Sequence, residues 1–121
     1  MRTELTLAAE KDVRDILRQT IELFGEEQLR AYSRIVQSGI DMVAERPDRP
    51  SSFDREEIAK GVRSLHLELA GNRRGSAAHV LYYTIGQLSN GTEGVLMLRL
   101  LHESAEPRRR VKRALARGDS R

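Results

Sequence analysis

The spacing of apolar residues changes once along this chain of 121 residues, and the change constrains the fold more than any other feature. Up to about residue 45, apolar residues recur at every third or fourth position, which is the period of an amphipathic helix. From about residue 61 they recur at every second position, as in a strand with one exposed face. We therefore expect one α+β domain spanning residues 1–121, with helices on one face of a largely antiparallel sheet.

Two helices are expected in the first half. The first begins after Thr6, which suits an N-cap, and ends at Gly25, which suits the position after a helix C-terminus. The second begins near Glu26 and ends before Pro47. Because the connection is so short, the two should form an antiparallel hairpin. Inside the second helix, Gly39 costs roughly 1 kcal/mol relative to alanine, and close approach to the neighbouring helix would explain it.

Short strands account for most of the remaining chain. One precedes the first helix, and a three-stranded meander follows the hairpin; the expected strands are residues 4–7, 61–69, 79–85 and 95–101. The expected strand at residues 61–69 has three leucines on one side, namely Leu65, Leu67 and Leu69. Residues 54–60 form at most a turn or two of helix, and Pro107 favours the first turn of a short final helix.

Composition excludes several classes of chemistry. The chain has no cysteine, so it has no disulfide and no thiolate nucleophile. Its histidines lack the spacing of a helical metal-binding pair, and His66 and His79 are best interpreted as partly exposed cross-strand residues. With no phosphate-binding loop or nucleophile motif, we expect no metal and no cofactor. Without a membrane-spanning run or secretory signal, we expect a soluble, cytoplasmic protein.

Charge is distributed unevenly along the chain. Residues 1–60 carry 13 acidic and 10 basic side chains, whereas residues 61–121 carry 5 and 11. Most of the excess lies in residues 106–121, expected to be a basic helix and tail. The cations of this segment are Arg108, Arg109, Arg110, Lys112, Arg113, Arg117 and Arg121. Such a segment attracts phosphates or an acidic protein, or it is a solvated tail that binds nothing in particular.

Arg99 interrupts an otherwise apolar strand, and its guanidinium must find a carboxylate, a carbonyl or water. One interpretation is a buried pair with a helix carboxylate or with loop carbonyls. The other places Arg99 with Arg63 on a concave face that receives a phosphate or an acidic peptide. Tyr82 and Tyr83 must point to opposite sides of their strand, and packing is the simpler role for both.

Several segments resemble a known family. HVLYYTI at residues 79–85, VLMLRLLHES at residues 95–104 and the following Glu106, Pro107 and Arg108 look like the C-terminal half of ParE-type toxins. The opening ELTLAAEKDVRDIL is similar to the family's first strand and helix. Over nearly its whole length the chain resembles the RelE/ParE superfamily of type II toxin–antitoxin systems. The resemblance implies a short N-terminal strand, a helix hairpin packed on a mainly antiparallel sheet, and a short basic C-terminal helix.

The resemblance also implies a function. ParE-type toxins bind DNA gyrase and stabilise its cleaved-DNA intermediate, acting as inhibitors rather than catalysts. A cognate ParD-like antitoxin is implied as well, whose acidic C-terminal segment wraps the toxin and whose N-terminal part binds operator DNA. The expected target contacts are Arg108, Arg109, Arg110, Lys112 and Arg113. The expected antitoxin contacts are Arg63, Tyr82 and Arg99.

Two other functions stay open at this point. The RelE branch of the superfamily cuts messenger RNA on the ribosome, and the residues available for such chemistry here are Arg63, Arg99 and His102. The absence of a lysine cluster on the second strand, and of any aromatic residue after His102, disfavours cleavage. The third function is a nucleic-acid-binding module that uses the basic helix, although exposed aromatic residues for base stacking are scarce.

Overall fold

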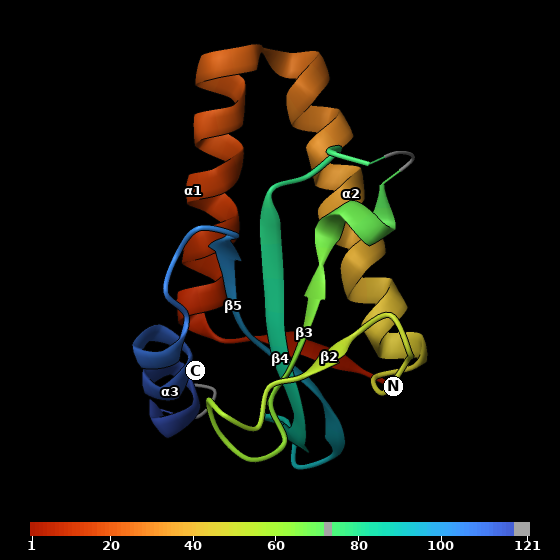
Figure 1. Cartoon of the computed structure of the whole chain (residues 1–121), viewed down its shortest axis with the longest axis vertical. Coiled ribbons are helices and arrows are strands. Elements are labelled where there is room, and N and C mark those ends of the chain that lie inside the picture. The colour runs from red at the N-terminus through yellow and green to blue at the C-terminus, as the bar shows by residue number, and fades with distance from the viewer. Residues whose placement is uncertain (72–73, 118–121) are drawn as a thin grey trace.

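The computed structural model describes residues 1–71 and 74–117, and these residues form three α-helices, one short 3₁₀ helix and one five-stranded sheet (Figure 1). The expected α+β fold is confirmed. Parts of the expected 71–75 loop, and the end of the basic tail at residues 118–121, lie outside the described residues. In chain order the elements are β1 (Thr3–Leu5), α1 (Leu7–Phe24), α2 (Glu26–Glu45), β2 (Phe53–Asp54), β3 (Arg63–His66), η1 (Leu67–Ala70), β4 (His79–Gln87), β5 (Glu93–His102) and α3 (Arg108–Arg117).

The helix hairpin has the predicted bounds. Thr6 caps α1, since its hydroxyl oxygen accepts the Ala9 N–H at 3.0 Å. The same hydroxyl donates to the Leu98 carbonyl at 2.9 Å, which attaches the start of the helix to β5. Gly25 turns the chain with a φ of 90° that favours glycine. In Figure 1 the closed end of the hairpin extends beyond the sheet.

The strand expected at residues 61–69 is too long, because β3 ends at His66 and η1 follows. The His66 ring nitrogen Nδ1 accepts the Glu68 N–H at 3.1 Å and so caps the turn that ends the strand. Leu67 is therefore fully buried against α2, while Leu69 is exposed. The close neighbour of Gly39 is η1 rather than α1, since a Cβ at Gly39 would lie 2.4 Å from Leu67 Cδ2.

Residues 54–60 were expected to form at most a turn or two of helix, and they contain one hydrogen-bonded turn, in which the Arg55 carbonyl accepts the N–H groups of Ile58 and Ala59. Phe53 and Asp54 form β2, which pairs antiparallel with β3 and adds a strand to the sheet. The Asp54 carboxylate accepts the Glu56 N–H at 2.8 Å, and Gly61 has a φ of 81°. This local side-chain bond competes with helix hydrogen bonds, so residues after Asp54 form turns.

The strand order is β1-β5-β4-β3-β2, with β1 parallel to β5 and the other pairs antiparallel. The predicted interior position of the last strand is therefore confirmed. Gly94 on β5 lies opposite Gly86 on β4. A Cβ at Gly94 would lie 2.6 Å from the Arg2 carbonyl oxygen, whereas nothing lies within 4 Å of the equivalent position at Gly86. Only Gly94 is thus required by the approach of the N-terminal segment.

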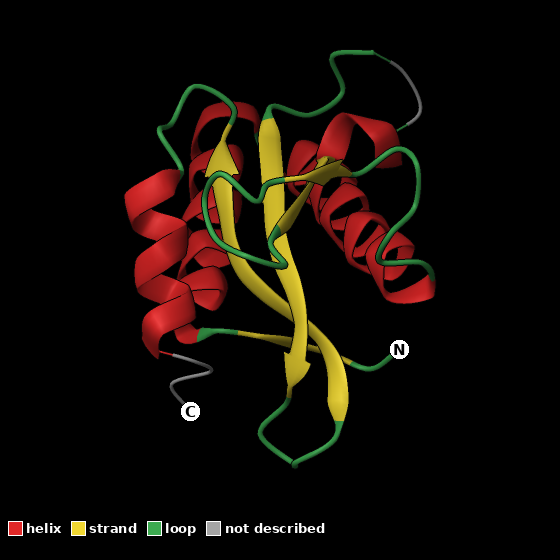
Figure 2. Ribbon diagram, turned by 60° about the horizontal axis from the view of Figure 1, so that its bottom comes forward, coloured by secondary structure: helices red, strands yellow, loops and turns green. Residues whose placement is uncertain are grey.

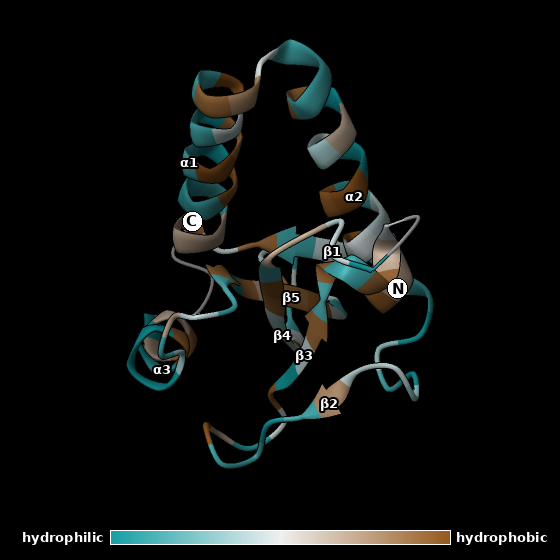
Figure 3. Ribbon diagram, turned by 45° about the horizontal axis from the view of Figure 1, so that its top comes forward, coloured by the Kyte–Doolittle hydropathy of each residue, from teal (hydrophilic) through white to brown (hydrophobic). Residues whose placement is uncertain are grey.

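Both faces of the sheet are buried. One face packs on α1 and α2, and Tyr83, Leu65 and Met97 are fully buried there. The other face packs on α3 and the 55–62 segment, with Tyr82 and Leu98 at its centre. Figure 3 shows the sheet between the hairpin and α3, and Figure 2 shows α3 beside β5. The two tyrosines point to opposite faces and both pack, as predicted. None of the described helices has the length and apolarity to span a membrane.

Candidate functional site

Arg99 has the carboxylate partner that the sequence required. Asp12 on α1 accepts two hydrogen bonds from its guanidinium, from Nε at 2.7 Å and from Nη2 at 2.8 Å. The same carboxylate accepts the backbone N–H of Leu100 at 2.9 Å. The hydrogen bonds that Arg99 donates to Asp12 raise the pKa of Arg99, with burial acting against them, so this arginine keeps its charge. The buried-pair interpretation of Arg99 is therefore confirmed.

A β-bulge interrupts β5 next to Arg99. Tyr82 pairs with Arg99 and Tyr83 pairs with Met97, which leaves Leu98 as an extra residue on β5. Because of the bulge, Leu98 and Arg99 both lie on the face of Tyr82, whereas Leu100 lies with Leu81 on the face that packs on α1 and α2. The bulge also presents the Leu98 carbonyl to Thr6. Sequence alternation gave no sign of it.

A cleft of ≈ 480 Å³ opens between the first turns of α1 and the inner side of α3. It contains five basic side chains, namely Lys11, Arg99, Arg110, Arg113 and Arg117. Asp12 and Asp15 are its two carboxylates, and both are paired, since Asp15 accepts a 2.7 Å hydrogen bond from Lys11. The hydrogen bond with Lys11 lowers the pKa of Asp15. The cleft therefore has an excess of positive charge.

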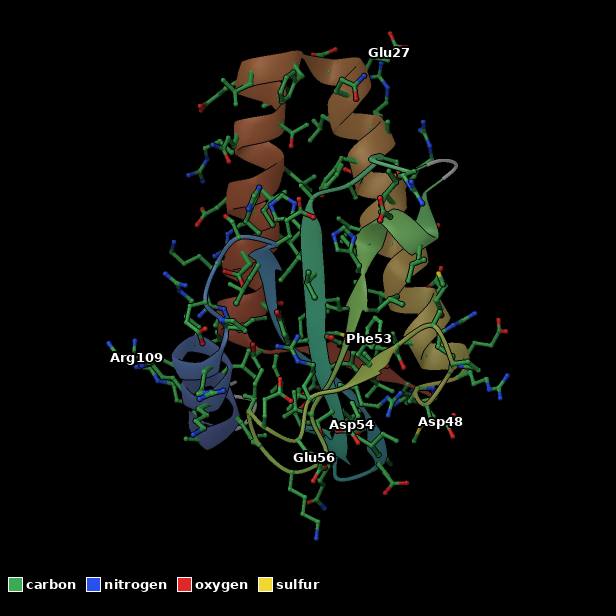
Figure 4. The ribbon with its side chains drawn as sticks, viewed as in Figure 1. Glu27, Asp48, Phe53, Asp54, Glu56 and Arg109 are labelled. Carbon is green, nitrogen blue, oxygen red and sulfur yellow. The ribbon has the colours of Figure 1, made fainter. Side chains whose placement is uncertain are left out.

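The expected target residues divide between two faces of α3. Arg110 and Arg113 face the cleft, together with Arg117, which was not among the expected contacts. Arg108, Arg109 and Lys112 line a shallower depression on the other side of the helix. Figure 4 shows Arg109 extending away from the body of the protein. The apolar residues between these faces, Val111 and Ala114, are buried against the sheet.

Arg63 and Tyr82 lie apart from this cleft. The Arg63 guanidinium donates to the Ser52 hydroxyl from Nη2 at 2.8 Å and from Nε at 3.1 Å, which ties β3 to the loop after α2. Tyr82 is 5 % exposed, and the Arg55 guanidinium lies over its ring at 5.3 Å from the centroid. The structure thus gives Arg63 and Arg99 separate partners, and although Tyr82 pairs directly with Arg99 across the sheet, its ring is covered.

The residues available for RNA cleavage are also dispersed. Arg63 pairs with Tyr83 at the middle of β4, whereas His102 pairs with His79 at the first residue of β4. Four residues of strand correspond to about 13 Å. A general base and a phosphate-binding cation must contact the same nucleotide, so this separation gives no support to Arg63, Arg99 and His102 as one catalytic group.

The three histidines gather at one end of the sheet, which the sequence did not show. His79 and His102 form an edge-to-face ring contact with centroids 5.5 Å apart, and His66 Nε2 lies 2.6 Å from a carboxylate oxygen of Glu103. Tyr32 on α2 lies 2.5 Å from His79 Nδ1 through its hydroxyl oxygen. The antiparallel register between β4 and β5 creates this cluster, and it could have been found only by aligning the two strands.

Burial, with the neighbouring His102, lowers the pKa of His79 to about 4, so its imidazole is neutral near pH 7. A neutral ring can accept the Tyr32 O–H at Nδ1, while the Ala78 N–H donates to the Tyr32 oxygen at 3.3 Å. The cluster thus joins α2 to the sheet. Over residues 1–71 and 74–117, no group of three or more His, Asp or Glu side chains is placed to hold a metal ion.

Comparison with known protein families assigns the chain to one of them. The family model described as "ParE toxin of type II toxin-antitoxin system, parDE" matches residues 3–107. The chain belongs to the ParE toxin family. The family resemblance seen in the sequence is therefore confirmed, and the matched segment ends immediately before α3, where this ParE toxin carries most of its excess positive charge. Comparison with curated proteins finds no match.

Proposed function

We propose that this ParE toxin inhibits DNA gyrase by stabilising the cleaved-DNA complex, without covalent chemistry of its own. Membership of the family supports the proposal, and the single observation that carries it is α3. This helix has ten residues, of which six are basic and none is acidic, and all six cations are exposed. A target made of DNA and a DNA-binding enzyme would be attracted by such a surface.

Within this proposal, α3 supplies the target contact. Its contact residues are Arg108, Arg109, Arg110, Lys112 and Arg113. Because they occupy two faces of one short helix, the target would surround α3 rather than meet a single side. The helix is held only by its apolar side, so its cations can all be engaged without unpacking the sheet.

We further propose that a ParD-like antitoxin neutralises the toxin in the cytoplasm, and that operator DNA is bound through the antitoxin. An acidic antitoxin segment would contact Arg99 at the floor of the cleft and Arg63 at the loop after α2. Tyr82 is too buried for a direct contact and would act by supporting Arg55 above its ring. Screening predicts that the affinity for such a segment falls as salt rises.

A supercoiling assay tests the target. Purified toxin added to gyrase and relaxed plasmid should reduce supercoiling, and detergent treatment should release linear DNA. The variant Arg30→Glu/Arg34→Glu, altered on the outer surface of α2, serves as the control and should retain inhibition. Undiminished supercoiling, together with cuts in ribosome-bound messenger RNA, would instead establish the RelE-like nuclease function.

A further inference from the structure

Three arginines on the inner side of α3 have no acidic partner among residues 1–71 and 74–117. In the described part of the chain, no carboxylate lies within ion-pair distance of Arg110, Arg113 or Arg117. The two carboxylates in the cleft are committed elsewhere, Asp12 to Arg99 and Asp15 to Lys11. The positive charge of the cleft is therefore available to a ligand.

The three arginines form a row. They occupy positions i, i+3 and i+7 of one helix, so their side chains share a face and extend over about 10 Å along the helix axis. A guanidinium binds phosphate oxygens through paired N–H groups. Successive anions along a linear ligand fit such a row better than a single small anion does.

The wall opposite α3 strengthens this preference for anions. It contains the N-terminal turn of α1, including Leu7 and Ala8, together with the ammonium group of Lys11. The positive end of the helix dipole faces the same space. An anion in the cleft would therefore meet favourable charge from two elements.

An acidic polypeptide, such as the antitoxin segment proposed to contact Arg99, would find only side-chain charge in the cleft. A peptide strand gains affinity by adding to a free sheet edge, but here the edge of β5 beyond β1 is already occupied. The Leu98 carbonyl accepts the Thr6 hydroxyl, and the Leu100 N–H donates to Asp12. Side-chain charge is what remains for recognition, and a nucleic-acid backbone is recognised in that way.

We infer that this toxin binds the phosphate backbone of double-stranded DNA directly, through the row of Arg110, Arg113 and Arg117. The inference deepens the proposed function and rests on it. It assigns the cleft side of α3 to the DNA of the target complex. It adds Arg117 to the contact surface and gives α3 two kinds of neighbour, with DNA on the cleft side and protein on the side of Arg108 and Arg109.

Fluorescence anisotropy with a labelled duplex of about 20 base pairs tests the inference between about 50 and 200 mM salt. With three phosphate contacts, the logarithm of the binding constant should fall against the logarithm of salt concentration with a slope of about −2.7. In Arg113→Gln/Arg117→Gln the slope should be about −0.9, because each lost contact reduces it by roughly 1. The matched variant Arg30→Gln/Arg34→Gln loses the same charge from α2 and should keep the slope of the wild-type protein.

Three results would overturn the inference: no binding to the duplex at the lowest salt, an equal loss in both variants, or tighter binding of a polyglutamate peptide than of DNA through the same two arginines. The last result would assign the cleft to an acidic polypeptide. Circular dichroism of both variants verifies their folding. Because the assay contains no gyrase, its failure is distinguishable from failure of the supercoiling experiment.

Discussion

Asp12 and Arg99 are 87 residues apart in the chain, yet two hydrogen bonds of 2.7 and 2.8 Å join the carboxylate of one to the guanidinium of the other. The pair is mostly covered, with side-chain exposures of 12 % and 20 %. Since Asp12 also accepts the Leu100 N–H, a single carboxylate fixes α1 on the bulged part of β5. Removal of the Asp12 carboxylate leaves the Arg99 guanidinium and the Leu100 N–H without their hydrogen-bond acceptor.

Asp12→Ala should therefore lower the free energy of unfolding by about 2–4 kcal/mol, as measured by urea denaturation. Asp15→Ala is the matched control on the same helix. It removes an exposed pair with Lys11 and should cost less than about 0.5 kcal/mol. A stability of Asp12→Ala equal to that of the control would show that the pair is only a surface interaction.

Gly94→Ala should destabilise the sheet by about 1–3 kcal/mol, because the new methyl group would overlap the Arg2 carbonyl and force β1 away from β5. Gly86→Ala, at the directly paired position on β4, meets nothing and should change the free energy of unfolding by less than about 0.5 kcal/mol. Thermal unfolding of the two variants gives the comparison. Equal effects would exclude overlap with the Arg2 carbonyl as the reason for glycine at position 94, since neither glycine has a positive φ.

The stability of the fold should fall as the pH drops from 6.5 to 4. The unfolded chain takes up a proton at His79 near pH 6.5, whereas the folded chain does so only near pH 4, so acid favours unfolding within that window. His79 is partly exposed to solvent, so its contribution should stay below about 1.4 kcal/mol per pH unit.

His79→Gln is the comparison for this pH dependence, since it keeps a polar side chain but cannot titrate. Urea unfolding at several pH values should give a smaller slope for the variant than for the wild-type protein. The other groups near the ring, Glu103, His102 and His66, stay in both proteins and cancel in the difference. Identical slopes would exclude His79 as the source.

Arg109→Glu/Arg110→Glu should weaken growth arrest in cells that produce the toxin without its antitoxin, because the pair reverses charge on both faces of α3. Both side chains are exposed, so the fold should survive the change. Arrest is scored by colony counts after induction, at matched levels of soluble protein. Full arrest by the folded double variant would remove these positions from the target contact.

Much of the fold follows from local sequence signals. Thr6, Gly25 and Pro107 are capping, turning and helix-starting residues whose effect needs no tertiary context, and the elements begin and end near them. The end of β3 was missed because leucines continue to alternate through Leu69, while the decisive hydrogen bond comes from the side chain of His66. The alternation of apolar residues does not show that a side-chain hydrogen bond competes with the backbone hydrogen bonds of the strand.

The site was less predictable than the fold. That Arg99 needs an anionic or polar partner follows from its apolar neighbours, but the identity of Asp12 depends on how α1 lies across β5 and on the bulge at Leu98. The charge of residues 108–117 was evident from composition. Its division into two faces depends on where Val111 and Ala114 pack, and the histidine cluster depends on strand register.

The attachment of α3 has a consequence for how such a toxin can change over time. Its hold on the domain comes from a narrow apolar side, while every cation lies outside that contact. Substitutions among the arginines can therefore retune what the molecule recognises at little cost to folding. A lineage could exchange one target surface for another while the rest of the domain stays as it is.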